Sequence, residues 1–323
     1  MRKVGVLGTG AMGRVHGRHY LKIPDTELHF HERDAEKAAA YAERFGAISA
    51  DSGEELIERV DVVDVCLPTH LHFEYAAMAL RAGKPVFCEK PMCRTTRECA
   101  DLVELSHKTG VPVMPAQVVR YFPEFRRARE LVREGAVGVP AAIRTRRGGA
   151  YPRGSEDWFG KFPFSGGVVM DLMIHDFDWI RWTFGEVERV FAQSLTFSGI
   201  EELDYALATL TLESGALAHV EGTWADPGGF RVTFEISGCD GFIEHDSRLA
   251  AALRTTTAGG SVSESPLFPA EDPYYSEIRA FLDAVDAGTP PPVPPEDGWA
   301  AVALCEAAIE SVRTGRAVKP AHL

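Results

Sequence analysis

Basic residues are in short supply in this chain. Its 323 residues include 34 Lys and Arg against 47 Asp and Glu, which gives a formal net charge of −13 at pH 7. Nucleic-acid binding depends on neutralising phosphates with basic side chains, and an anionic membrane surface attracts the same side chains. The composition therefore predicts that neither nucleic acid nor a membrane is a partner.

Long apolar runs, paired cysteines and a leader sequence are also missing. The longest stretches without Asp, Glu, Lys or Arg, 109–119 and 190–200, have 11 residues each, whereas a membrane-spanning helix needs about 20. The 6 cysteines include no C-x-x-C pair and are too sparse for a disulfide scaffold. Because the N-terminal Met-Arg-Lys-Val-Gly-Val-Leu lacks the apolar core of a signal peptide, we expect a cytoplasmic protein.

The first 120 residues alternate between strand-like and helix-like segments. Short apolar runs are followed by amphipathic stretches, a pattern typical of a parallel sheet with helices on both faces. The expected strands are 3–7, 27–31, 62–67, 86–88 and 111–114, and the expected helices are 11–22, 35–45, 54–59, 73–82 and 95–108. We therefore predict a doubly wound α/β domain over residues 1–120.

Residues 121–323 have a different pattern. Strand-like segments follow one another between residues 187 and 245 with Gly-containing turns and no helices between them. Consecutive strands of this kind predict an antiparallel sheet, and so an α+β domain. A further strand is expected over 141–147, and helices are expected over 123–134, 168–184, 274–287 and 298–313.

A glycine-rich motif, Gly8-Thr9-Gly10-Ala11-Met12-Gly13, joins the first expected strand to the first expected helix. In such a motif the first glycine permits a tight turn, the second lets the backbone approach a pyrophosphate, and the third lets the helix pack closely on the strand. The helix N-terminus then offers unpaired N–H groups to the phosphates. This context favours a dinucleotide site at Gly8, Gly10, Ala11, Met12 and Gly13 over a glycine-rich turn without a ligand.

Glu32 ends the second expected strand, 19 residues after Gly13. An acidic residue about 20 positions after the motif accepts hydrogen bonds from the adenosine ribose hydroxyls, which favours NAD. Arg33 follows, and an arginine there can instead receive the 2′-phosphate of NADP. Because Glu32 would repel that phosphate, we predict NAD, with NADP as the alternative. A merely solvated strand end is the simpler interpretation of both residues.

The fifth expected strand ends in Glu89-Lys90-Pro91. Open α/β sheets bind ligands at the carboxyl ends of their strands, and Pro91 favours an extended backbone at Lys90. A partly desolvated lysine beside a positively charged nicotinamide has a lowered pKa and can accept a proton near neutral pH. Without the cofactor motif, a solvated surface charge would be the simpler interpretation of Lys90.

Asp171, His175 and Asp178 follow the pair Gly166-Gly167 at helical spacing, on one face of an otherwise apolar helix. Two carboxylates and an imidazole are costly inside such a helix unless they are paired or face a cleft. A single histidine there would more often be a hydrogen-bonded core residue. The three together favour an active-site face.

Together, the glycine motif, Cys66-Leu67-Pro68-Thr69-His70-Leu71-His72, Glu89-Lys90-Pro91 and Asp171-x-x-x-His175 resemble the glucose–fructose oxidoreductase, inositol dehydrogenase and MocA family. The resemblance extends to Glu306-Ala307-Ala308-Ile309-Glu310-Ser311 near the C-terminus. It implies an N-terminal Rossmann domain and a C-terminal domain (residues 121–323) built on an open, mostly antiparallel sheet. By the same family analogy we expect a homodimer or a homotetramer.

The resemblance also implies roles for individual residues. Lys90 corresponds to the catalytic lysine, Asp171 and His175 lie at the substrate, and Glu89 lies near the nicotinamide ribose. The segment that passes the pyrophosphate and ribose of the cofactor would contribute Leu67, Pro68, Thr69 and His72.

Four other side chains flank the expected cleft and are candidate substrate contacts: Arg120, Tyr121, Tyr151 and Trp158. No metal site is predicted, because His29-x-His31 and His70-x-His72 have no third or fourth ligand at a recognisable spacing.

These observations predict an NAD(P)-dependent oxidoreductase that transfers a hydride between nicotinamide and a secondary alcohol or carbonyl of a sugar, polyol or related small molecule. Lys90 is the expected general base, and Asp171 orients the substrate. His175 hydrogen-bonds the reacting oxygen and can share the proton transfer, so the choice between Lys90 and His175 as primary proton acceptor stays open. Two alternatives stay open: a catalytically idle dinucleotide-binding sensor, and an NAD-dependent glycosidase.

Overall fold

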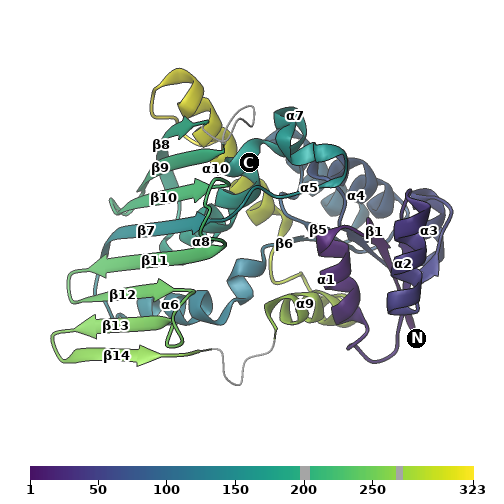
Figure 1. The fold of residues 1–323 in the computed structure, drawn as a ribbon, viewed down its shortest axis with the longest axis horizontal. Helices are drawn as coiled ribbons and strands as arrows, with labels where there is room; N and C mark the ends of the chain where they lie inside the picture. The colour runs from purple at the N-terminus through teal and green to yellow at the C-terminus, as the bar shows by residue number, and fades with distance from the viewer. Residues whose placement is uncertain (197–203, 267–271) are drawn as a thin grey trace.

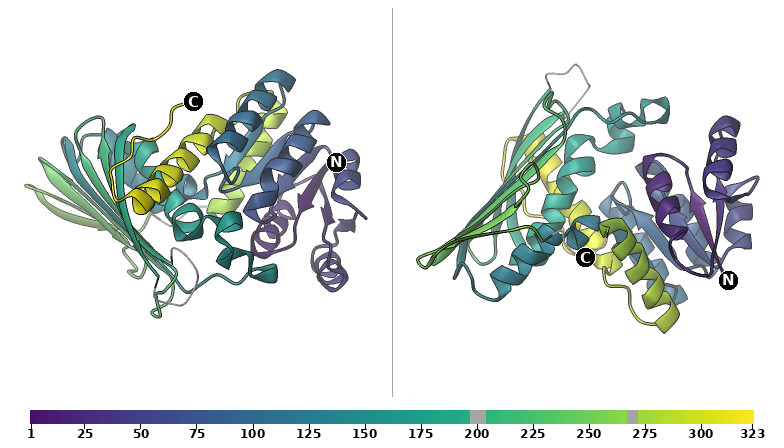
Figure 2. Two further views of the ribbon diagram at one scale, coloured as in Figure 1. Left: turned by 90° about the horizontal axis from the view of Figure 1, so that it is seen from above. Right: turned by 60° about the horizontal axis from the view of Figure 1, so that its bottom comes forward.

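The computed structural model describes residues 1–196, 204–266 and 272–323, and two sheets dominate it (Figure 1). One sheet has six strands from residues 2–116, and the other has eight strands from residues 140–264. Figure 2 shows helices between the two sheets, whereas the outer face of the eight-stranded sheet carries none in the described part of the chain.

The six-stranded sheet is parallel, in the order β3-β2-β1-β4-β5-β6. Its strands are β1 (Arg2–Leu7), β2 (Thr26–His31), β3 (Ile48–Ser49), β4 (Val62–Val65), β5 (Val86–Glu89) and β6 (Val113–Ala116). Its helices are α1 (Ala11–Tyr20), α2 (Ala35–Phe45), α3 (Gly53–Arg59), α4 (His72–Arg81) and α5 (Thr96–Thr109). The strand order reverses between β1 and β4, the point at which such sheets bind ligands. The predicted doubly wound α/β fold is confirmed.

Local sequence determines where these helices begin and end. The Asp34 carboxylate accepts hydrogen bonds from two N–H groups in the first turn of α2, which ends at Gly46 with φ 60°. At the start of α5, Thr95 and Glu98 form a capping box. Such signals are visible in the sequence, and the predicted bounds of α2 agree with the structure.

The eight-stranded sheet is open, in the order β14-β13-β12-β11-β7-β10-β9-β8, and only the β7–β10 pair is parallel. Its strands are β7 (Pro140–Gly148), β8 (Val187–Leu195), β9 (Tyr205–Leu212), β10 (Leu217–Thr223), β11 (Arg231–Gly238), β12 (Gly241–Asp246), β13 (Leu253–Thr257) and β14 (Gly260–Glu264). The predicted open, mostly antiparallel sheet is confirmed. The β13–β14 hairpin lies beyond the strands that the sequence predicted.

The inner face of this sheet packs on helices α6 (Pro123–Arg133), α8 (Ile174–Phe184) and α10 (Pro295–Thr314), with α7 (Phe162–Ser165) nearer the N-terminal half. Helix α9 (Pro273–Ala287) instead packs against α1, where Ile278, Phe281 and Leu282 share an apolar cluster with Val4 and Phe30. The chain therefore returns to the first sheet near its C-terminus, and the domain boundary at residue 120 stays a prediction.

The helix predicted over 168–184 is interrupted by one wider turn. Residues Val169–Met173 form a π-helical turn, and Ile174–Phe184 continue as α8. Wider turns of this kind occur mostly inside α-helices and are frequent at functional sites. The turn contains Asp171 and directly precedes the turn with His175.

Candidate active site

The glycine motif forms the turn between β1 and α1. Gly8 has φ 89°, and a Cβ on Gly13 would lie 2.0 Å from the Gly8 carbonyl oxygen, so helix and strand meet backbone to backbone. A Cβ on Gly10 would meet no atom within 4 Å. Ala11 and Met12 open the first turn of α1, which has no side-chain cap and no acidic residue. Its N–H groups thus stay open to an anion, and the turn fits the pyrophosphate of a dinucleotide.

Glu32 lies beside this turn. Its Oε2 accepts hydrogen bonds from the Thr9 hydroxyl at 2.6 Å and from the Thr9 N–H at 3.3 Å. Its Oε1 accepts a hydrogen bond from the Asp34 N–H at 3.1 Å. Burial alone would raise the pKa of Glu32, but these hydrogen bonds lower it, so the carboxylate is ionised at neutral pH. The Arg33 side chain is 78% exposed and lies 3.9 Å from Glu156. A fixed carboxylate here suits ribose hydroxyls and opposes a 2′-phosphate.

Lys90 follows β5 at the carboxyl edge of the parallel sheet. Its Nζ donates to the Asp171 carbonyl oxygen at 2.6 Å and to the Asp171 Oδ1 at 2.9 Å. The two side chains are 15% and 16% exposed, so the pair is mostly buried but a small molecule can still reach it. The contact joins residues 81 positions apart in the chain.

His175 lies four residues beyond Asp171. Its Nδ1 is buried and has no hydrogen-bond partner among the residues that the structure describes. Burial lowers the pKa of His175 well below its usual value, and the positive charges of Lys90 and Arg147 lower it further. The imidazole is therefore neutral at physiological pH. The structure thus brings together Lys90, Asp171 and His175, the three residues that the sequence singled out for chemistry.

Two family models match the chain. The model described as an oxidoreductase family with an NAD-binding Rossmann fold matches residues 2–117, and the GFO/IDH/MocA C-terminal domain matches residues 125–244. The chain belongs to the GFO/IDH/MocA oxidoreductase family. A myo-inositol 2-dehydrogenase of Thermotoga maritima is 31% identical to it over 98% of both chains.

Solved structures of other proteins have a fold similar to that of this chain. A levoglucosan dehydrogenase in complex with NADH and levoglucosan superposes with a TM-score of 0.90 at 25% identity, over 100% of both chains. GenD2 from gentamicin A biosynthesis, in complex with NAD, superposes with a TM-score of 0.89 at 28% identity, over 99% of this chain and 97% of that one. The family match makes the N-terminal sheet of this chain an NAD-binding Rossmann domain. Of the helices in the described residues, none combines the length and apolar character that crossing a bilayer demands.

The segment that the family resemblance placed along the cofactor follows β4. Leu67 and Pro68 are partly exposed, whereas Thr69 is 3% and His72 is 1% exposed. The two ring nitrogens of His72 each lie 2.7 Å from a backbone carbonyl oxygen, one of Leu67 and one of Pro91. This geometry favours a supporting role for His72, which ties the segment to the turn after Lys90, over the direct cofactor contact that the sequence predicted.

The structure places Arg120 in a buried ion-pair network. Its Nε and one terminal nitrogen donate to Asp178 at 2.7 and 2.6 Å, and its other terminal nitrogen donates to Asp297 at 2.8 Å. The side chains of Arg120 and Asp178 are only 4% and 1% exposed. Three of the five N–H groups of Arg120 are thus paired with carboxylates, and Arg120 ties α8 to α10. Substrate contact by Arg120 stays a prediction. Asp178 belongs to the same ion-pair network, not to the active-site face that its spacing suggested.

The remaining candidate substrate contacts are aromatic. Tyr121 packs beside the N-terminal apolar cluster. The Tyr151 hydroxyl donates to Asp157 Oδ1 at 2.7 Å, and Trp158 stacks on Phe159 with ring centroids 3.9 Å apart. The structure thus gives each of the three a partner within the protein, and substrate contact by Tyr121, Tyr151 and Trp158 stays a prediction.

Sequence reasoning missed a buried polar cluster below Lys90. It consists of His16 in α1, Asp64 in β4, Cys66 directly after that strand, and Glu89 at the end of β5. The available signal is Asp64 itself, since an acidic residue in a central apolar strand needs a buried partner. The partner is 48 positions away and does not show in the sequence pattern.

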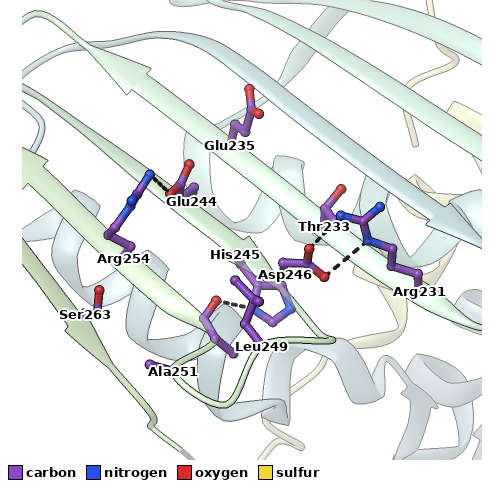
Figure 3. Close-up of a pocket in the computed structure, with 11 residues that line it drawn as sticks. Arg231, Thr233, Glu235, Glu244, His245, Asp246, Leu249, Ala251, Arg254 and Ser263 are labelled. Carbon is purple, nitrogen blue, oxygen red and sulfur yellow. Dashed lines mark hydrogen bonds and ion pairs between the residues drawn. The ribbon is translucent and has the colours of Figure 1, made fainter.

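A separate pocket of about 370 Å³ lies on the outer face of the eight-stranded sheet (Figure 3). Within the lining, Arg231 pairs with Asp246 at 2.6 Å and Arg254 pairs with Glu244, whereas Glu235 pairs with Arg144, which is outside the lining. Neighbouring residues of β11, such as Phe234, point to the opposite, buried face. This pocket is therefore distinct from the site at Lys90.

Proposed function

We propose that this protein is an NAD-dependent dehydrogenase that oxidises a secondary alcohol of a sugar or polyol, or reduces the matching carbonyl. The proposal rests on the Lys90–Asp171 ion pair beside a neutral His175, at the carboxyl edge of a sheet with a glycine-rich phosphate loop. The myo-inositol and levoglucosan activities of its relatives support the substrate class.

Lys90 is the proposed proton acceptor. In the ion pair with Asp171, Lys90 is an ammonium, and it must release one proton before it can accept another; the positive charge of a bound nicotinamide would favour that release. The neutral amine then has two N–H groups, and Asp171 can accept one through its carbonyl oxygen and one through Oδ1. The lone pair of Nζ is then available to accept the proton of the substrate hydroxyl. The ammonium that forms lies 2.9 Å from the Asp171 carboxylate, which stabilises its charge. In the reductive direction Lys90 returns this proton.

His175 has a complementary task. As a neutral imidazole it forms a hydrogen bond with the reacting oxygen without adding a second positive charge beside Lys90. Its partial burial also limits the water that can reach that oxygen. NAD, when bound, accepts the hydride from the substrate carbon. The role of the protein is to hold that carbon near the nicotinamide and to move the hydroxyl proton.

The cofactor would be held by the N-terminal half. The N–H groups of the first turn of α1 would donate hydrogen bonds to the pyrophosphate, and Glu32 would accept hydrogen bonds from the adenosine ribose hydroxyls. We propose NAD over NADP, because the carboxylate of Glu32 is fixed by Thr9 and ionised. Residues 1–120 would thus bind the cofactor, and residues 121–323 would complete the substrate site.

A screen of sugars, polyols and their keto forms tests this function directly. Purified protein is mixed with each compound and NAD or NADH, and the absorbance of the reduced cofactor is followed. Turnover of at least one compound is expected. Tight NAD binding without any turnover would instead support the idle sensor. Release of an aryl group from an aryl glycoside without net NADH formation would support the glycosidase.

We also propose that the protein is a homo-oligomer, a dimer or a tetramer. The outer face of the eight-stranded sheet has no helix over it in the described residues, and it exposes four large apolar side chains by 39–60%: Phe191, Leu195, Leu207 and Leu217. Such surface is commonly covered by a subunit. Light scattering should give the mass of two or four chains, and a monomer would contradict the proposal.

Cell fractionation tests the cytoplasmic location proposed from the sequence.

A further inference from the structure

His16 is buried between α1 and the parallel sheet, against acidic side chains from two neighbouring strands. Its Nδ1 lies 2.9 Å from Asp64 Oδ2, and its Nε2 lies 3.2 Å from Glu89 Oε1. The side chains of His16, Asp64 and Glu89 are 1%, 0% and 8% exposed. The other oxygen of Glu89 accepts the Lys90 backbone N–H at 3.0 Å. The contacts therefore run from Asp64 through His16 and Glu89 to Lys90.

Both ring nitrogens of His16 face a carboxylate oxygen. A neutral imidazole has a single N–H, so one of its nitrogens would turn a lone pair toward an anion. An imidazolium donates from both nitrogens and places a positive charge between the two carboxylates. Asp64 also accepts the Cys66 thiol at 3.3 Å. Within the described residues Nε2 is not aligned for a hydrogen bond, so its 3.2 Å contact with Glu89 is an electrostatic one, and a positively charged His16 suits both carboxylates.

The pKa values of His16 and of the titratable groups around it are consistent with a protonated His16. Burial would lower the pKa of His16, but Cys66 and Asp64 raise it well above its usual value. Burial raises the pKa of the Cys66 thiol, so the negative charge beside His16 comes from Asp64. Burial and the nearby Glu89 raise the pKa of Glu277 well above its usual value. The groups that face the cluster from the packed elements are His19, Tyr20, Tyr41, Asp64, Cys66, Glu89, Tyr274 and Glu277.

We propose that His16 is a positioning residue: its imidazolium, anchored by Asp64, holds the Glu89 carboxylate at the cofactor side of Lys90. This inference rests on the proposed function and on the position near the nicotinamide ribose that the family resemblance implies for Glu89. When His16 loses its proton, the positive charge that attracts the Glu89 carboxylate is lost, and the carboxylate is held less firmly in its place. The cofactor then loses a ribose contact, and Lys90 loses the hydrogen bond to its backbone N–H.

The variant Asp64→Asn tests the inference through the pH dependence of NAD binding. The amide removes the anion that keeps His16 protonated and can itself donate to Nδ1, so the pKa of His16 falls. The dissociation constant of NAD is measured by calorimetry at pH 6 and pH 9. We expect that it rises about tenfold more between these pH values in Asp64→Asn than in the wild type, because the charge that attracts Glu89 is lost at the higher pH.

A second variant and a matched control complete the experiment. His16→Gln lacks the charge at every pH, so NAD binding should be about tenfold weaker than in the wild type at both pH values, without added pH dependence. Glu27→Gln removes the carboxylate 2.6 Å from Nε2 of His29, a second histidine–carboxylate pair in β2, and should leave NAD binding unchanged.

Wild-type NAD binding by His16→Gln at both pH values would overturn the inference, even where its melting temperature falls. The same holds for Asp64→Asn if it folds and shows the pH dependence of the wild type. Because the measured quantity is binding, this test is independent of turnover. A wild-type protein that binds NAD but oxidises no sugar or polyol would refute the proposed function. The effect of His16 on NAD binding could still be interpreted.

Discussion

The two halves of this protein carry their functional residues in different ways. In the N-terminal half, the phosphate loop is a run of six neighbouring residues, 8–13, whose backbone makes the site. In the C-terminal half, Asp171 and His175 acquire a chemical role only through Lys90, 81 positions from Asp171. A backbone site therefore shows in local sequence, whereas a side-chain site depends on which distant partner each residue meets.

One helical segment shows how much the partner matters. Its three acidic residues pair with three different basic residues: Asp171 with Lys90, Asp176 with Arg147 and Asp178 with Arg120. The last two carboxylates are 0% and 1% exposed, whereas Asp171 is 16% exposed. Residues of one type on one helix thus divide into structural pairs and one pair that a substrate can reach.

The largest expected effect is on Lys90. Lys90→Ala should lower kcat by about 10²–10⁴-fold, the range for loss of a positioned acid–base group, with NAD affinity almost unchanged. Lys84→Ala, two residues before the opposite end of the same strand, is the control and should keep wild-type turnover. Steady-state kinetics and NAD titration measure both. Near-normal turnover of Lys90→Ala would remove Lys90 from the mechanism.

The division between structural and chemical pairs predicts opposite outcomes for Asp178 and Asp171. Asp178→Ala leaves the buried guanidinium of Arg120 with Asp297 alone and should lower the free energy of unfolding by about 3 kcal/mol. Asp171→Asn should lower kcat with a much smaller change in stability. Urea unfolding followed by tryptophan fluorescence gives the stabilities. The division fails if Asp178→Ala keeps its stability and loses turnover instead.

In the N-terminal half, Glu32→Gln should weaken NAD binding about tenfold, because a charged acceptor of ribose hydroxyls becomes a neutral amide. NADP binding should weaken less or improve, since the repulsion of its 2′-phosphate is removed. Calorimetric titration with both cofactors gives the two dissociation constants. Wild-type protein that binds NADP more tightly than NAD would show that Arg33, not Glu32, controls this position.

The smallest expected effect concerns the proton on His175. Its pKa is well below 6.5 in the folded protein, so the unfolded chain binds a proton that the folded chain does not as pH falls below 6.5. The free energy of unfolding of the wild type should therefore fall by about 1 kcal/mol more than that of His175→Gln between pH 6.5 and one unit below it. Equal losses in both proteins would show that His175 is protonated in the folded state.

What the sequence could predict follows the same division. The bounds of α2 follow from Asp34 and Gly46, and the cofactor loop follows from its glycines, because these signals act within a few residues. The ion pairs of Arg120 were not predicted, since its partners come from α8 and α10. The His16 cluster was missed for the same reason.

Two further features escaped prediction because no local rule specifies them. The π-helical turn Val169–Met173 differs from an α-helix by one residue per turn, and apolar periodicity alone does not separate the two. The β13–β14 hairpin, Leu253–Glu264, is polar and lies at the edge of its sheet, so it lacks the buried apolar alternation by which strands are recognised.

A crystal structure of the protein with NAD and a substrate polyol tests the central claim most directly. The account predicts that one substrate oxygen lies within about 2.6–3.2 Å of both the Lys90 Nζ and a ring nitrogen of His175, with the carbon that bears it facing the nicotinamide. A substrate whose reacting oxygen is bound elsewhere, with Lys90 still closed on Asp171 and His175 out of reach, would contradict it.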